Sequence, residues 1–186
     1  HDLRRQGKKI PWYRIHVPMR SLDQTYVQQY FKKEITNLIE KLENNCRFSF
    51  SMENFQESVE KYRIFRTLHE KIEHQVADGK TSFYDYVKLV FSTQFYSLDF
   101  KIRSFKQFHR ENQPKGSKNG KYGDKRIMLS GIMPPSLEII RALEKNGFRI
   151  VGNDLGPFTR ANACTPSLGE FENPESYYVK FYRLHF

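Results

Sequence analysis

Cysteine is scarce in this sequence. Its 186 residues include two cysteines, Cys46 and Cys164, which lie far apart along the chain. Two distant cysteines cannot form the disulfide framework of a small secreted domain, and they lack the close pairing of zinc ligands. We therefore expect two free thiols in a protein of the reducing cytoplasm.

Long apolar runs, nucleotide-binding glycine motifs and suitably spaced histidines are also missing. No segment approaches the roughly 18 apolar residues of a membrane helix, so we expect no membrane span. Neither a G-x-G-x-x-G fingerprint nor a P-loop is present. His69 and His74 lie five positions apart, whereas two metal ligands on one helix face lie four apart. The sequence predicts no metal site, and these patterns by themselves specify no reaction.

Aromatic residues and positive charge are abundant. Phe, Tyr and Trp make up 15% of the chain, which favours a folded protein with a real core. Lys and Arg number 31 against 21 Asp and Glu, and many of them gather in two polar segments: Arg4, Arg5, Lys8, Lys9 and Lys115, Lys118, Lys121, Lys125, Arg126. Such segments are typical of solvated loops, and nucleic-acid binding is the alternative interpretation.

Both ends of the sequence look truncated. The chain starts at His1 without a methionine, and it ends at Phe186 inside an apolar, aromatic pattern. A natural terminus usually ends in polar residues. We expect this chain to be a fragment of a longer polypeptide.

The first part of the chain predicts helices. After an extended lead-in over residues 1–20, apolar residues recur at three- and four-residue spacing through residues 21–111. We expect four amphipathic helices in this block: 22–44, 51–76, one that begins after Ser82, and 98–110. Ser21, as part of a capping box with Gln24, and Ser82 are the expected N-caps, and Gly79 is the expected helix end.

The pattern changes after residues 112–125, a predicted basic flexible linker. Short apolar runs at 126–130 and 148–152 flank a helical stretch that begins at Leu137. This order predicts a βαβ unit with two parallel strands, the first of them buried. A last helix is expected over 174–184, after the N-cap Asn173. The predicted fold class is α/β: a helical block followed, over residues 126–186, by part of a Rossmann-like parallel-sheet half.

Polar residues follow both predicted strands. Ser130 and Gly131 end the first strand, and Asp154 and Arg160 follow the second. Because ligands collect at the carboxyl ends of parallel strands, we expect these four residues to form the rim of a substrate or cofactor cavity. The alternative is that Asp154 caps a turn and Arg160 is only its ion-pair partner.

Four stretches of the second part carry a resemblance to a known family. They are Arg126–Gly131, Pro134–Ile140, Leu143–Phe148 and Ile150–Leu155 with Arg160 beyond it. This pattern resembles the 2-hydroxyacyl-CoA dehydratase D-component family, whose superfamily includes benzoyl-CoA reductase subunits. Three upstream segments agree in a more general way: Ile15–Pro18, Leu38–Glu43 and Ser51–Arg66.

The resemblance implies a fold and an activity. Subunits of this family have two Rossmann-like halves, bind a [4Fe-4S] cluster through cysteines and pair with a second homologous subunit. An ATP-dependent activator supplies one electron at low potential. With an acyl-CoA substrate, this electron drives either radical elimination of water from a 2-hydroxyacyl-CoA or reduction of an aromatic acyl-CoA.

The cysteines depart from the family pattern. The family often has a cysteine in the loop where this chain has Gly156, and neither Cys46 nor Cys164 matches a ligand position. We therefore expect no cluster and no activity from this fragment alone. Two other functions remain open: a basic nucleic-acid-binding module and a non-catalytic accessory protein of the same fold.

Overall fold

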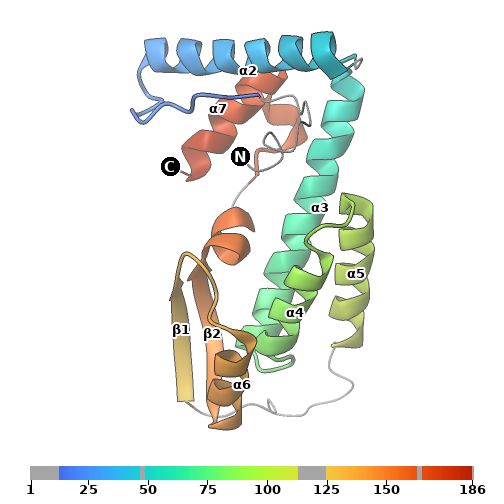
Figure 1. The fold of residues 1–186 in the computed structure, drawn as a ribbon, viewed down its shortest axis with the longest axis vertical. Helices are drawn as coiled ribbons and strands as arrows, with labels where there is room; N and C mark the ends of the chain where they lie inside the picture. Colours follow the sequence, from blue (N-terminus) through green and yellow to red (C-terminus); the bar gives the residue numbers. More distant parts are fainter. Residues whose placement is uncertain (1–12, 47–48, 113–124, 163–164, 186) are drawn as a thin grey trace, which may run out of the picture. The chain divides into compact units, whose positions relative to one another are not determined.

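The computed structural model describes residues 13–46, 49–112, 125–162 and 165–185 (Figure 1). Both basic segments lie outside these ranges, except for Lys125 and Arg126, and so do Cys164 and most of the predicted linker. The chain divides into two compact units, residues 1–58 with 164–186 and residues 59–163. The domain limits proposed from composition remain a prediction.

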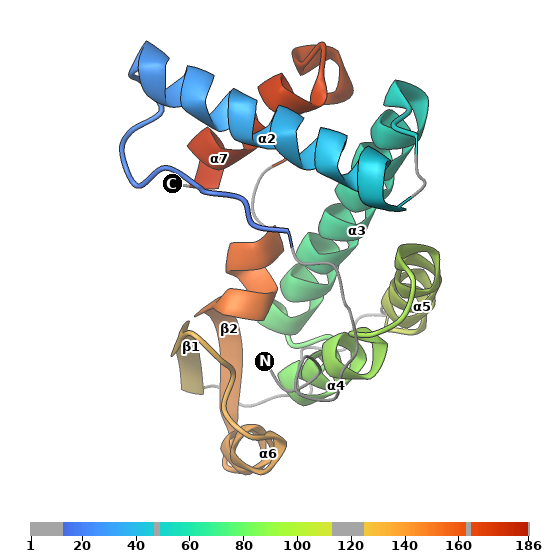
Figure 2. The same cartoon turned by 45° about the horizontal axis from the view of Figure 1, so that its top comes forward.

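The first unit joins segments from opposite ends of the sequence. Helix α2 (Thr25–Cys46) packs against α7 (Pro174–His185), and the beginning of α3 (Met52–Ala77) belongs to the same unit (Figure 2). Its core comprises Leu22, Val27, Phe31, Ile35 and Val179. A short turn, η2 (Leu168–Glu170), precedes α7.

The second unit contains the sheet. It comprises the rest of α3, α4 (Phe83–Thr93), α5 (Leu98–Glu111), β1 (Lys125–Gly131), α6 (Leu137–Lys145), β2 (Phe148–Leu155) and the helical turn η1 (Gly156–Arg160). The apolar stripe of α3 supplies Leu68, Ile72 and Val76 to the core. The remaining core residues come from every other element but β1: Phe83, Tyr86, Val87, Ile102, Phe105, Ile140, Ile150, Leu155 and Phe158.

The two strands are parallel, as predicted. Their register runs from Lys125 opposite Phe148 to Gly131 opposite Leu155, with one irregularity after Ile127. Helix α6 connects them, so the βαβ unit is confirmed. In the described residues the sheet has no third strand, and the Rossmann-like extension is not part of what the structure shows.

Most predicted helix ends are confirmed. The Ser82 hydroxyl accepts the Asp85 N–H at 2.9 Å and caps α4, and the Asn173 side chain accepts the Ser176 N–H at 2.8 Å and caps α7. Gly79 follows α3 with a φ of 71°, a left-handed conformation that glycine adopts at little cost. No helix of the described residues is long and apolar enough to cross a membrane.

The predicted cap at Ser21 is wrong. Helix α2 begins at Thr25, and the Val27 and Gln28 N–H groups donate to the Gln24 carbonyl. The Ser21 hydroxyl instead accepts the Asp23 N–H at 3.2 Å. Leu22 is buried in the core of the first unit. This burial holds residues 21–24 in a turn and delays the start of the helix.

The expectation that the first strand is buried is also wrong. Met128 on β1 is 67% exposed, and only alternate residues such as Ile127 and Leu129 pack against the core. A continuous apolar run indicates a strand covered on both faces. Here exposed and half-buried residues alternate along most of β1, so one of its faces remains open. β2 is the more buried strand and extends to Leu155, beyond its predicted end at Gly152.

Candidate functional site

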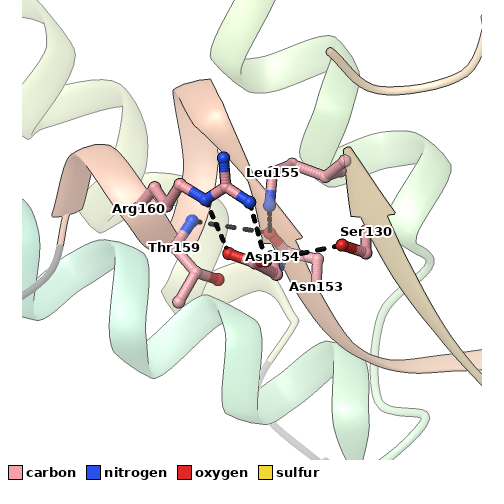
Figure 3. Close-up of polar contacts among 6 residues, drawn as sticks. All are labelled: Ser130, Asn153, Asp154, Leu155, Thr159 and Arg160. Carbon is pink, nitrogen blue, oxygen red and sulfur yellow. Dashed lines mark hydrogen bonds and ion pairs between the residues drawn. The ribbon is translucent and has the colours of Figure 1, made fainter. Parts of the chain in front are cut away.

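The carboxyl ends of β1 and β2 bring the four predicted rim residues together (Figure 3). Ser130 lies opposite Asp154 in the register, and Gly131 lies opposite Leu155. The Ser130 hydroxyl donates to Asp154 Oδ2 at 3.4 Å. We call Ser130, Gly131, Asp154 and Arg160 the rim. Their proximity follows from the parallel register, and their role in function remains a prediction.

Arg160 reaches back from η1 to Asp154. Its Nε donates to Oδ1 at 2.8 Å, and its Nη2 donates to Oδ2 at 2.7 Å (Figure 3). These hydrogen bonds lower the pKa of Asp154, since they favour its ionised form. Both side chains are about half exposed. An exposed ion pair of this kind contributes little to stability, so an incoming anion can take the guanidinium fork at small cost.

Gly156 joins the two loops that follow β1 and β2, which we call the rim loops. Its N–H donates to the Ile132 carbonyl at 3.1 Å. A Cβ at this position would lie 2.6 Å from the same carbonyl oxygen, closer than a side chain tolerates. The loop geometry therefore requires glycine here and has no room for a cysteine side chain.

A second polar group lies on the other face of β2 and was not predicted. Glu73, near the end of α3, accepts three hydrogen bonds at Oε1: from Asn153 Nδ2 at 3.2 Å, Thr159 Oγ1 at 3.1 Å and the Tyr86 hydroxyl at 3.2 Å. Asn153 precedes Asp154 on the strand, and alternate strand residues point to opposite faces. Asn153 Oδ1 also accepts the N–H groups of Leu155 and Thr159, both at 3.4 Å (Figure 3).

His69 also belongs to this group, through its contact with Tyr86. It is 2% exposed, and its Nδ1 lies 2.6 Å from the Tyr86 hydroxyl. Burial lowers the pKa of His69 to about 3, so the ring is neutral at physiological pH. Because Tyr86 donates to Glu73, the protonated Nδ1 of His69 donates to Tyr86. We call His69, Glu73, Tyr86, Asn153 and Thr159 the glutamate network.

Glu73 is the titratable centre of this network. Burial raises its pKa, and the hydrogen bonds from Asn153, Thr159 and Tyr86 counteract only part of this effect. It lines a cavity of about 310 Å³ in the second unit. A carboxyl group with a perturbed pKa at a cavity wall is a common feature of functional sites. The sequence held one signal for it: His69 and Glu73, two polar residues, lie one turn apart next to the apolar stripe of α3.

The residues that the structure describes do not fit an iron–sulfur cluster. Such a cluster takes cysteine thiolates as ligands, and the described part of the chain contains one cysteine, Cys46, whose Sγ lies 3.3 Å from the Tyr13 hydroxyl. No group of three or more His, Cys, Asp or Glu residues in the described ranges could hold a metal ion. At the rim, the close contact at Gly156 also leaves no room for a cysteine side chain that could ligate a cluster.

Comparison with known families gives a match that covers most of the chain. Residues 3–176 match the family described as 2-hydroxyglutaryl-CoA dehydratase, D-component. No curated protein matches the chain in sequence. The family match includes the second unit and most of the first, and both the rim and the glutamate network lie within it.

Proposed function

We propose that this chain, which belongs to the 2-hydroxyglutaryl-CoA dehydratase D-component family, is part of a dehydratase subunit that acts on an acyl-CoA thioester. The observation that carries the proposal is the family match over residues 3–176. The position of the rim supports it, since the carboxyl ends of parallel strands are where α/β folds bind their ligands.

Arg160 is the rim residue best suited to a substrate. A guanidinium can hold a CoA phosphate, or the oxygen of an activated thioester, through two parallel hydrogen bonds. In the structure this fork is occupied by Asp154, which keeps it oriented at the strand ends. The Ser130 hydroxyl donates to Asp154 Oδ2, which also accepts from Arg160 Nη2. The proposed role of Asp154 and Ser130 is to position Arg160 until an anion takes the fork.

The complete enzyme supplies the redox chemistry. The proposed [4Fe-4S] cluster lies outside the described residues, because these residues do not fit it. The proposed partners are a second homologous subunit and an ATP-dependent activator, in the cytoplasm. The overall reaction is loss of water from a 2-hydroxyacyl-CoA or, in the related reductases, reduction of an aromatic acyl-CoA.

Arg160→Lys in the assembled enzyme complex tests the proposal. Lysine keeps the charge but loses the planar fork, so turnover of the acyl-CoA should fall about tenfold or more. The melting temperature should stay nearly unchanged because the Arg160–Asp154 pair is exposed. Arg126→Lys, at the opposite end of β1, is the matched control and should leave turnover intact.

Two results would contradict the proposal. If Arg160→Lys lowers the melting temperature and spares turnover, Arg160 is only the structural partner of Asp154. If the unaltered complex dehydrates or reduces no acyl-CoA when its activator is present, the family function does not extend to this protein.

A further inference from the structure

The cavity beside the glutamate network has mostly apolar walls. It lies between the end of α3, the start of α4 and the strands, and its apolar lining includes Val76, Ala77, Phe83, Met128 and Ile150. Its volume of about 310 Å³ suits a small organic molecule. No lysine or arginine occurs among the described residues that line it.

Glu73 presents one oxygen to this cavity. All three hydrogen bonds that Glu73 accepts go to Oε1. No group of the described residues bonds to Oε2, and Glu73 lines the cavity, so this oxygen is left for a bound molecule. The donors are fixed by their own contacts: Tyr86 by His69, and Asn153 by two backbone N–H groups.

The network is arranged around a negative charge. The Asn153 amide, the Thr159 hydroxyl and the Tyr86 hydroxyl all donate to Glu73, and His69 supports Tyr86 from behind. Donors that converge on one carboxyl group favour its ionised form. Burial opposes this form and raises the pKa of Glu73. The carboxylate of Glu73 is half-buried and thus partly withdrawn from water, yet in the described part of the chain no lysine or arginine forms an ion pair with it.

The titratable and charged groups around Glu73 come from several elements, and the neighbouring His74 imidazole lowers the pKa of Glu73 by its charge. Helix α3 contributes Glu70 and His74 to the cavity wall, and these two side chains lie 4.0 Å apart and are largely exposed. Helix α4 contributes Tyr86, and β2 and η1 contribute the neutral Asn153 and Thr159. His69 is neutral and lies behind Tyr86. The walls thus combine the hydrogen-bonded carboxyl group of Glu73 with apolar surface, and Glu70 and His74 lie at their exposed edge.

We infer that this cavity is a binding site for a small organic ammonium ion with a compact apolar body, whose N–H groups donate to Glu73 Oε2. The apolar walls would cover the hydrocarbon part, and the ammonium group would pair with the half-buried carboxyl group of Glu73. This ligand chemistry does not depend on the proposed dehydratase role, in which Glu73 has no part.

Three probes of nearly equal shape and different charge test the inference. Isoamylamine, isoamyl alcohol and isovalerate are titrated into the 186-residue chain, and binding is followed by NMR of the methyl groups of Val76, Ile150 and Val151. The amine should bind about tenfold more tightly than the alcohol, because its hydrogen bond to Glu73 is charge-assisted. Isovalerate should not bind. Amine affinity should rise as the pH rises through the pKa of Glu73, since the ionised carboxylate is the form that binds.

Three variants connect the binding to this carboxyl group. Glu73→Gln should reduce amine affinity to that of the alcohol and remove its pH dependence. Glu70→Gln, the matched control at the exposed edge of the same cavity, should leave amine affinity nearly unchanged. Ala77→Leu fills part of the cavity without touching Glu73 and should weaken both the amine and the alcohol, which keeps the test valid if Glu73→Gln does not fold.

The inference fails if the alcohol or isovalerate binds as tightly as the amine. It also fails if the amine does not bind, or if it shifts only methyl groups outside the cavity. Unchanged amine affinity in a folded Glu73→Gln chain would overturn it as well.

Discussion

Two adjacent residues of β2 lie in contrasting surroundings. Asp154 faces the rim, where it is about half exposed and pairs with the cation Arg160. Asn153 is 8% exposed and binds Glu73, whose hydrogen-bond donors are all neutral. Water screens the charges of Asp154 and Arg160. The carboxyl group of Glu73 instead depends on the fixed dipoles of its hydrogen-bond donors. The exposed Asp154–Arg160 pair at the rim can thus separate easily, whereas the hydrogen bonds of the glutamate network hold Glu73 in one position.

The largest effect is expected from Asn153→Ala in the glutamate network. The variant removes a donor to Glu73 and leaves the Leu155 and Thr159 N–H groups without their acceptor. Buried polar groups without partners cost about 1–3 kcal/mol each, so the free energy of unfolding should fall by about 2 kcal/mol. Urea denaturation measures it. A loss below the experimental error would mean that water replaces the amide and that the network is not rigid.

Gly156→Ala tests the close contact at the rim. The new Cβ would meet the Ile132 carbonyl at 2.6 Å, and the loops must separate to admit it. We expect a loss of about 1–2 kcal/mol, typical of overpacking. Gly152→Ala is the control, because its Cβ would meet only the Met128 side chain at 3.8 Å. Equal stability of the two variants would show that the rim loops part easily and could admit a larger side chain.

Glu73→Gln should change how stability depends on pH. The folded chain raises the pKa of Glu73, so it holds this proton more tightly than the unfolded chain does. The stabilisation is therefore complete below the ordinary pKa of glutamate and is lost as the pH rises through the folded value. Glutamine keeps an acceptor for the three donors and removes this loss. The variant should gain stability relative to the unaltered chain as the pH rises, by up to about 1 kcal/mol.

Thermal melts across that pH range check this prediction. Glu70→Gln serves as the control, since the Glu70 side chain is largely exposed, and its curve should follow that of the unaltered chain. A Glu73→Gln chain that loses stability as the pH rises would show that the three donors outweigh burial at this carboxyl group.

Asp154→Asn at the rim should have the smallest effect. The lowered pKa of Asp154 means that its contribution to stability is present above the ordinary pKa of aspartate and is lost as the pH falls through the folded value. Because the pair with Arg160 is exposed, we expect no change in melting temperature at neutral pH, at low or high salt. A clear loss of melting temperature that high salt abolishes would show that the Asp154–Arg160 pair stabilises the fold, as the hydrogen bonds of the glutamate network do.

Local sequence signals predicted the helices and their order well. Apolar spacing indicated α2 to α5, and Ser82, Gly79 and Asn173 marked helix ends that the structure confirms. These signals succeed because a cap or a stripe depends on residues within one or two turns of each other. The cap at Ser21 failed for the opposite reason, since Leu22 is held by residues such as Val179 from the far end of the chain.

The rim and the glutamate network were unequally predictable. The rim follows from a parallel βαβ unit, because the register places Ser130 beside Asp154 once both strands are located. The glutamate network joins α3, α4, β2 and η1 through hydrogen bonds that span as many as 86 positions of sequence, and no local pattern links Glu73 to Thr159. Its members resemble ordinary surface residues until packing makes Glu73 and Asn153 neighbours.

The sequence by itself determined the amphipathic helices, the parallel strand pair, the rim at its carboxyl ends and the resemblance to the dehydratase family, because each depends on short spacing or on a contiguous motif. Tertiary structure alone decided that β1 stays open on one face, that Gly156 excludes a side chain and that Glu73 becomes a half-buried carboxyl group with a raised pKa. The physical reason is that burial and close contact depend on which distant segments meet, and dielectric surroundings then set the charge state of a residue.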